Sequence, residues 1–278
     1  MPTIPGAESI GGAVGRDRRG RIWLGVSVAD RPGASARLLA YDPASGRVTD
    51  HGDALGQLRR AGLLRGGERQ ALIRAKIVAD SDGNLYFASA DGARDAATAD
   101  GSSGWGSHLW RYRPPDSDWG RFTSRWEHLA SVSEPLVSLA GGGRSLYAVG
   151  AGQVLYRFDT ASGRLDSITV ASARGRAAPE VLADHRGHVY FLRLEPLSAT
   201  LSADRGQPVS EELVLATLVE LDGGLLEVAE TPLTETVATE PSHGISGFAA
   251  LADGAILFLT SAGGLYRIEP SEEGPASV

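Results

Sequence analysis

The stretch that decides the fold is Asp17-Arg18-Arg19-Gly20-Arg21-Ile22-Trp23-Leu24, followed by Leu38-Leu39-Ala40-Tyr41-Asp42. The first part joins a turn to an apolar strand, because Asp hydrogen-bonds its own backbone at a turn and Gly accepts a positive φ. The second part shows the alternation that is expected of a half-buried strand. The turn of the first part predicts that its apolar strand pairs antiparallel with a strand just before Asp17.

Both parts recur in the same order along the chain, which marks an internal repeat. Further copies of the first part are Gly83-Asn84-Leu85-Tyr86-Phe87, Gly143-Arg144-Ser145-Leu146-Tyr147-Ala148, Gly187-His188-Val189-Tyr190-Phe191 and Gly254-Ala255-Ile256-Leu257-Phe258. Further copies of the second part are Leu109-Trp110-Arg111-Tyr112-Arg113, Leu155-Tyr156-Arg157-Phe158-Asp159, Leu218-Val219-Glu220-Leu221-Asp222 and Leu265-Tyr266-Arg267-Ile268-Glu269. With one strand before the first part and one after the second, each unit has four strands.

Repeated four-stranded units are the blades of a β-propeller, so the sequence predicts an all-β, five-bladed propeller of antiparallel blades. No segment has the βαβ pattern of a parallel α/β fold. An unspecific β-sandwich and a fragment of a six- or seven-bladed ring are the alternatives. We expect one domain over 1–278, closed by residues 2–8, with a partly helical cap over 54–74. The expected blades are 9–53, 75–132, 136–170, 179–233 and 245–278.

The Asp-x-x-Gly-x-Ile-Trp-Leu element followed by Leu-x-x-Tyr-Asp-Pro-x-Ser-Gly resembles the repeats of streptogramin-lyase-like and sensor-kinase propellers. The resemblance covers nearly the whole chain at the level of blades and implies the propeller fold. Such repeats occur in lyases, hydrolases and sensors alike. The resemblance to streptogramin lyases implies chemistry by histidine and glutamate with a magnesium ion, but this sequence has no matching His-x-Glu-type cluster.

Composition excludes several classes of function. The 278 residues carry a net charge of −7, which disfavours nucleic-acid binding because phosphates are neutralised by a basic surface. The absence of cysteine excludes disulfides, thiolate catalysis and sulfur-bound metals. No apolar run approaches the ~18 residues of a membrane span, so no membrane partner is expected. The N-terminus lacks the features of a signal peptide, which predicts a cytoplasmic protein, or a secreted or periplasmic one if a leader was removed.

The longest predicted connections lie between the second and third strands of a unit and between successive units. In a propeller, these connections share one face of the ring. Because long loops on a rigid scaffold tend to carry binding residues, this face is the predicted location of the site. The connection near residues 116–126 is the exception.

Three side chains at the starts of the expected innermost strands are the predicted catalytic residues: Glu134, Glu180 and His243. Two carboxylates can act as acid and as base or nucleophile, at a separation that sequence does not give. An imidazole at a channel mouth suits general acid–base catalysis. The alternative for each residue is an ordinary solvated strand end.

Four further residues are predicted to bind substrate. Arg74 and Lys76 can hold an anionic group, or they can neutralise the two glutamates. Trp105 and His108 end the long connection of the second unit, where an indole can stack on a sugar or another ring. The alternative for Trp105 is packing beneath the loop.

No cofactor and no metal ligand set is predicted. A divalent cation stays open: Ca²⁺ because Asp91, Asp95 and Asp100 share one acidic loop, and Mg²⁺ because the resemblance to streptogramin lyases implies it. His185 and His188 lack a third ligand.

The sequence therefore predicts a propeller that binds a small polar or anionic molecule, or an oligosaccharide, at its channel mouth. A lyase or hydrolase working by acid–base catalysis is slightly favoured. A non-catalytic ligand-binding or sensing propeller and a protein-interaction scaffold are the alternatives.

Overall fold

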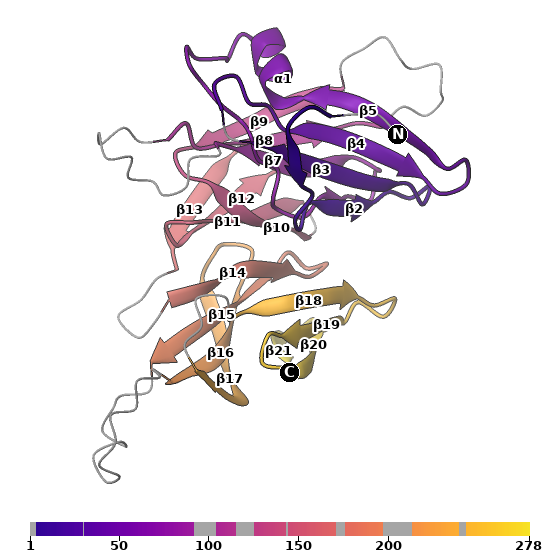
Figure 1. Cartoon of the computed structure of the whole chain (residues 1–278). Helices are drawn as coiled ribbons and strands as arrows, with labels where there is room; N and C mark the ends of the chain where they lie inside the picture. Colours follow the sequence, from indigo (N-terminus) through magenta and orange to yellow (C-terminus); the bar gives the residue numbers. More distant parts are fainter. Residues whose placement is uncertain are drawn as a thin grey trace. The chain divides into compact units, whose positions relative to one another are not determined.

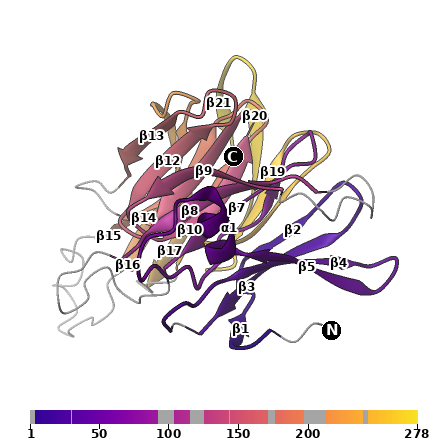
Figure 2. The same ribbon diagram turned by 90° about the horizontal axis from the view of Figure 1, so that it is seen from above.

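The computed structural model describes residues 4–29, 31–91, 104–114, 125–142, 144–170, 176–196, 213–238 and 243–278. These residues form five antiparallel sheets and a single helix, α1. Figures 1 and 2 label the strands and the helix in two views at right angles. Within each sheet the neighbouring strands follow one another closely along the chain. Five such meanders are the blades of a five-bladed β-propeller, so the predicted fold class is confirmed.

The first sheet has one strand more than the others because two short strands share its innermost position. Ala7 of β1 lies opposite Val28 of β3, and Val14 of β2 lies opposite Leu24 of the same strand. The strands of this sheet are β1 (Ala7–Ser9), β2 (Val14–Arg16), β3 (Ile22–Val28), β4 (Arg37–Asp42) and β5 (Arg47–Asp53).

The other four sheets have four strands each, in chain order. The second holds β6 (Val78–Ala79), β7 (Leu85–Ala90), β8 (Ser107–Tyr112) and β9 (Trp126–Val132), and the third holds β10 (Leu136–Gly142), β11 (Ser145–Gly150), β12 (Val154–Asp159) and β13 (Leu165–Thr169). The fourth holds β14 (Arg176–Ala183), β15 (Val189–Pro196), β16 (Leu213–Leu221) and β17 (Glu227–Ala238), and the fifth holds β18 (Ile245–Ala250), β19 (Ile256–Thr260), β20 (Leu265–Ser271) and β21 (Gly274–Ser277). Strands β7 and β11 are buried along their whole length, as expected where both faces of a blade are covered.

The repeated Asp fixes the turn between the first two strands of a blade by accepting several hydrogen bonds at once. In the fourth blade, Asp184 accepts from the backbone of Arg186 and His188 and from the hydroxyl of Tyr190, at 2.9, 3.0 and 2.8 Å. Asp17 and Asp80 bind their own turns in the same way and accept from Trp23 and Tyr86, the aromatic residues six positions later. The six-residue spacing of Asp and aromatic residue in the repeat therefore lets their side chains form a hydrogen bond.

Helix α1 (Ala54–Ala61) follows the first sheet directly. The Asp53 carboxylate caps its N-terminus by accepting the Gly56 N–H at 2.8 Å, and Gly62 ends it in the left-handed conformation at φ 71°. Leu55 and Leu58 are buried in the core that the first and second sheets share.

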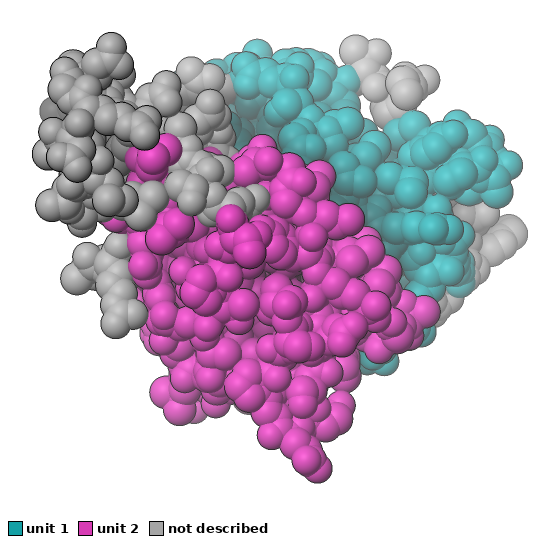
Figure 3. Space-filling model, turned by 90° about the horizontal axis from the view of Figure 1, so that it is seen from below, with its two compact units in different colours: residues 1–139, 150–152 teal, residues 140–149, 153–278 magenta. Residues whose placement is uncertain are grey.

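The chain divides into two compact units, which Figure 3 shows in different colours. Unit 1 comprises residues 1–139 and 150–152, and its core contains Trp23, Phe87, Trp110 and Tyr112. Unit 2 comprises residues 140–149 and 153–278, and its core contains Tyr190, Leu192 and Phe258. In the described parts of both units, no helix has the length and apolar character that crossing a membrane requires.

The predicted closing strand is wrong. Residues 2–8 were expected to complete the last blade, but β1 pairs with β3 of the first sheet, and the fourth strand of the last sheet is β21. The chain turns at Glu272 and Glu273, which places Ser271 opposite Gly274. Strand β21 also forms a hydrogen bond with the fourth blade, because Glu220 accepts the Ala276 N–H at 2.8 Å.

Candidate functional site

Four polar side chains of unit 1 form a connected group, which we call the histidine cluster: Glu68, His108, His128 and Ser131. Glu68 lies between α1 and the second sheet, while the other three lie on β8 and β9. The pairing of these strands sets His108 directly opposite Ser131 and Trp110 opposite His128. Directly opposed side chains lie on the same face of the sheet, so the register itself brings the hydroxyl to the imidazole.

His108 connects the carboxylate to the hydroxyl. Its Nε2 lies 2.7 Å from Glu68 Oε1, and its Nδ1 lies 3.0 Å from Ser131 Oγ and 2.9 Å from His128 Nε2. Since a carboxylate only accepts hydrogen bonds, Nε2 carries the proton and Nδ1 holds a lone pair. A nucleophile, a base and a group that orients the base therefore lie in one hydrogen-bonded chain.

Glu68 is held in place by groups from three parts of the chain. Its Oε2 accepts the Arg65 N–H at 3.0 Å, and its side chain is fully buried. Behind it, Gln70 donates to Glu68 at 3.4 Å and accepts from Ser89 at 2.7 Å, and Ser89 in turn accepts from the Trp110 indole at 2.9 Å. This buried polar chain fixes the carboxylate that orients His108.

Burial keeps both imidazoles uncharged at neutral pH. It lowers the pKa of His108 in spite of the adjacent Glu68, and it lowers the pKa of His128 to about 4, with a contribution from His108. His108 is 1% exposed, whereas Ser131 is exposed to solvent. A small molecule can therefore reach the hydroxyl while the base stays behind it.

The pKa of His128 predicts a pH-dependent stability of unit 1. The unfolded chain takes up a proton at His128 below its ordinary pKa of 6.5, but the folded chain does so only near pH 4. We therefore expect the contribution of His128 to the free energy of unfolding to be fully retained above pH 6.5 and to fall by about 1–3 kcal/mol between pH 6.5 and 4. This fall adds to those of His51 and His108, whose pKa values burial also lowers. Urea denaturation at pH 7.5, 6.5, 5.5 and 4.5 measures it, followed by tryptophan fluorescence, since all five tryptophans belong to unit 1.

In His128→Gln, the free energy of unfolding should fall by about 1–3 kcal/mol less between pH 6.5 and 4 than in the wild type. His185→Gln, at an exposed site of unit 2, should leave this pH dependence unchanged. An equal pH dependence in wild type and His128→Gln would contradict the assignment.

Trp105, predicted to bind substrate, lies at the end of the β7–β8 connection, three residues before His108. Its backbone N–H donates to the buried Asp91 at 3.0 Å, and its ring carbon Cζ2 lies 3.9 Å from where a Cβ on Gly67 would be. Asp91 also pairs with Arg69 at 3.3 Å. Trp105 thus packs on the segment that carries Glu68, and whether it also stacks on a ligand stays a prediction.

Arg74 and Lys76 alternate with the buried Ile73, Ala75 and Ile77, so both side chains are exposed on one side of the segment. Partial burial lowers the pKa of the Lys76 ammonium. Their predicted role in holding an anion stays a prediction.

In unit 2, the predicted catalytic residue Glu180 lies on β14, and His243 lies just before β18. Glu180 Oε2 lies 2.9 Å from where a Cβ on Gly244 would be, so the carboxyl packs directly on the residue that follows His243. His243 is buried, with its Nδ1 2.8 Å from Ser261 Oγ. Burial raises the pKa of the half-buried Glu180 carboxyl.

Glu134, the third predicted catalytic residue, belongs to unit 1, and its carboxylate accepts the backbone N–H of Gly152 at the β11–β12 turn. Glu180 belongs to unit 2, so the predicted carboxylate pair stays a prediction.

Within the described ranges, no group of three or more carboxylate and imidazole side chains is arranged to hold a metal ion. Of the acidic loop, Asp91 binds Arg69 and Trp105, while Asp95 and Asp100 lie outside the described residues. His185 and His188 contact Glu272 and Glu220 separately.

Sequence reasoning missed Glu68, His128 and Ser131. The signal for His128 and Ser131 lies in the fourth strand of the second blade, whose register with β8 pairs them with Trp110 and His108. Glu68 has no comparable signal, because it reaches His108 from a segment without regular structure.

No family model matches the sequence, and no curated protein matches it significantly. Among solved structures, BBS1N in its complex with ARL6DN aligns with 100% of this chain and 66% of its own at 10% identity and a TM-score of 0.51. A candidate gluconolactonase aligns over 95% and 75% at 12% identity and a TM-score of 0.50. KlAtg21 in complex with the coiled coil of AgAtg16 aligns over 96% and 69% at 11% identity and a TM-score of 0.50. Identities this low carry the fold alone, and by that measure, together with its five blades, the chain is a β-propeller.

Proposed function

We propose that this propeller is a hydrolase of small acyl compounds, carboxylic esters or lactones, with Ser131 as nucleophile and His108 as general base. One observation carries the proposal: Ser131 Oγ, His108 and Glu68 form a continuous hydrogen-bonded chain, with spacings of 3.0 and 2.7 Å. The same three roles define nucleophilic hydrolases on unrelated folds, where geometry and not chain order identifies them.

The reaction follows from the contacts of each group. Ser131 Oγ attacks the acyl carbon while its proton passes to His108 Nδ1, and Glu68 stabilises the imidazolium that forms. His108 then returns the proton to the departing alkoxide, which leaves an acyl-serine. Water, deprotonated by the same imidazole, releases the acid and restores Ser131. His128 Nε2, 3.2 Å from Ser131 Oγ, holds the hydroxyl in position.

The test uses the purified full chain with p-nitrophenyl acetate, p-nitrophenyl butyrate and glucono-δ-lactone. The lactone is included because one fold neighbour is described as a candidate gluconolactonase. Ser131→Ala should reduce turnover to the background rate, whereas Ser133→Ala, an exposed serine two residues further on, should retain it. A fluorophosphonate reagent should label Ser131, as peptide mass spectrometry would detect. Wild-type turnover in Ser131→Ala, or no turnover of any of these substrates by the wild type, would overturn the proposal.

A second candidate is an acid–base lyase or glycosidase site in unit 2, favoured by the raised pKa of Glu180 beside His243. A carboxyl group that keeps its proton can serve as the general acid in the cleavage of a glycosidic bond. Glu180→Gln and His243→Gln separate the candidates. Loss of turnover in these variants, with turnover retained in Ser131→Ala, would assign catalysis to unit 2.

A further inference from the structure

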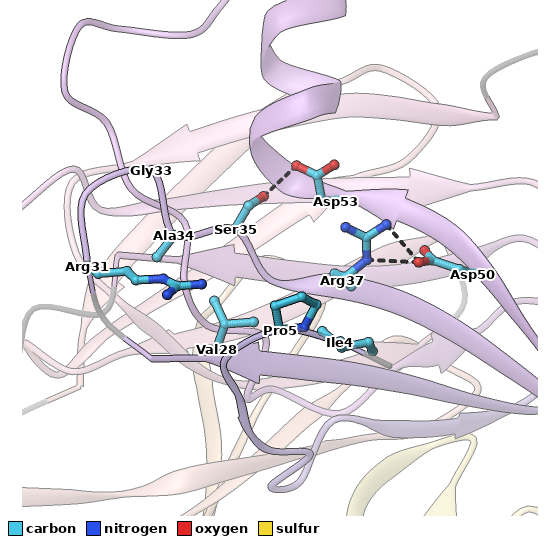
Figure 4. A pocket seen from close by; sticks show the side chains of 10 residues that line it. All are labelled: Ile4, Pro5, Val28, Arg31, Gly33, Ala34, Ser35, Arg37, Asp50 and Asp53. Atoms are coloured by element: carbon cyan, nitrogen blue, oxygen red, sulfur yellow. Dashed lines mark hydrogen bonds and ion pairs between the residues drawn. The ribbon is translucent and has the colours of Figure 1, made fainter. Parts of the chain in front are cut away.

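A pocket of about 420 Å³ opens in unit 1, and none of the residues that line it belongs to the histidine cluster (Figure 4). Its walls come from the N-terminal segment, the end of β3, the loop after it, and β4 and β5. Its apolar lining residues are Ile4, Pro5, Val28 and Ala34. The volume is in the range of pockets that hold small molecules.

Two of the four charged side chains that line the pocket neutralise each other. Arg37 and Asp50 form an ion pair, with Arg37 Nη2 2.7 Å and Nε 2.9 Å from the same carboxylate oxygen. Figure 4 shows this pair on one wall, turned toward one another. Their charges therefore contribute little net attraction to a ligand.

The other two charged side chains that line the pocket are Asp53 and Arg31. One oxygen of Asp53, Oδ1, accepts from Ser35 Oγ at 2.6 Å and from the Gly56 N–H at 2.8 Å. Both donors are neutral, so the negative charge of Asp53 is not balanced by a cation among the described contacts. Oδ2 of the same carboxylate is left to accept from a ligand.

Arg31 lies across the pocket from the Arg37–Asp50 pair, and its side chain reaches into the pocket (Figure 4). Its guanidinium lies over Gly6, with Nη2 3.2 Å from where a Cβ on Gly6 would be. Within the described ranges, Arg31 makes no ion pair. The five donors of a guanidinium form a fork that fits a carboxylate with two hydrogen bonds.

From this arrangement we infer that the pocket binds a zwitterion with an apolar group, the chemistry of an apolar α-amino acid. The ligand carboxylate binds Arg31, its ammonium binds Asp53, and its side chain packs on Ile4, Pro5 and Val28. Because Arg37 and Asp50 neutralise each other, the pocket presents one positive charge, on Arg31, and one negative charge, on Asp53. A ligand with two opposite charges matches both. A simple anion or a simple amine would satisfy only one of the two.

The experiment is isothermal titration calorimetry on the full chain with three probes of similar shape: L-leucine, 4-methylpentanoate, which lacks the ammonium, and isopentylamine, which lacks the carboxylate. We expect L-leucine to bind at least about 10-fold more tightly than either analogue, because each analogue loses the charged hydrogen bonds of either Asp53 or Arg31. Arg31→Ala should weaken L-leucine binding at least about 10-fold. Arg18→Ala, an exposed arginine in the β2–β3 turn, is the matched control and should not change it.

Equal binding of 4-methylpentanoate and L-leucine would overturn the assignment of Asp53 to an ammonium. No binding of any probe at 10 mM, or L-leucine binding that Arg31→Ala does not weaken, would overturn the site itself. Because the readout is binding, these outcomes are independent of whether Ser131 hydrolyses esters.

Discussion

Glu68→Gln is expected to lower kcat about 100- to 10,000-fold for any ester or lactone that the wild type turns over. The amide keeps the shape of the side chain but removes the charge that stabilises imidazolium on His108. It can also donate to Nε2, which would favour the tautomer with its proton on Nδ1, where Ser131 must deliver one. KM should change little, since Glu68 is buried behind His108 and does not touch substrate.

A positioning role is distinguished from a structural one by the split between kcat and KM and by the pH profile. The kcat of the wild type should rise with pH as the imidazole of His108 loses its proton. Glu68→Gln should shift the pH at which this rise occurs. Glu127→Gln is the matched control and should retain wild-type kcat. Glu127 lies on β9, the strand of Ser131, in an exposed ion pair with Arg111. A normal kcat in Glu68→Gln with unchanged stability would remove Glu68 from the mechanism.

Gly106→Ala is expected to destabilise unit 1 by about 2–5 kcal/mol, the sum of two separate effects. Gly106 has a φ of +71°, which an L side chain rarely adopts. A Cβ there would also overlap the carbonyl oxygen of Val132 and approach the Ser133 carbonyl carbon within 2.9 Å. Backbone atoms cannot rotate away, so β8 and β9 must separate where His108 faces Ser131.

Urea denaturation followed by tryptophan fluorescence measures the change. Gly46→Ala is the matched control, since Gly46 has a similar φ of +66° but nothing within 4 Å of its Cβ position. It should lose only the conformational part, about 1–2 kcal/mol. If the two variants lost equal stability, the close contact with Val132 would have no energetic weight.

The fold could be predicted because it rests on short-range rules that repeat. Asp17, Asp80 and Asp184 each bind their own turn and an aromatic residue six positions later, so each copy carries its own evidence. The closing strand was predicted wrongly because β1 and β21 depend on partners far away in the sequence. Nothing local to Ala7–Ser9 indicates that Val28, and not the last blade, lies opposite it.

The histidine cluster could be predicted only in part for the same reason. His108 was a candidate because it ends a long connection of the second blade. Glu68 reaches it across 40 positions of sequence, and its neighbours Gly66 and Gly67 give no periodic pattern from which to place it. A site whose members come from an irregular segment and a strand register is defined by tertiary structure alone.

The placement of β1 and β21 also bears on cooperativity. Among the described strands, no sheet combines the first strands of the chain with the last, so no ladder of backbone hydrogen bonds joins the two ends. Any coupling between the folding of the first blade and that of the last must then pass through side-chain packing or through the intervening blades.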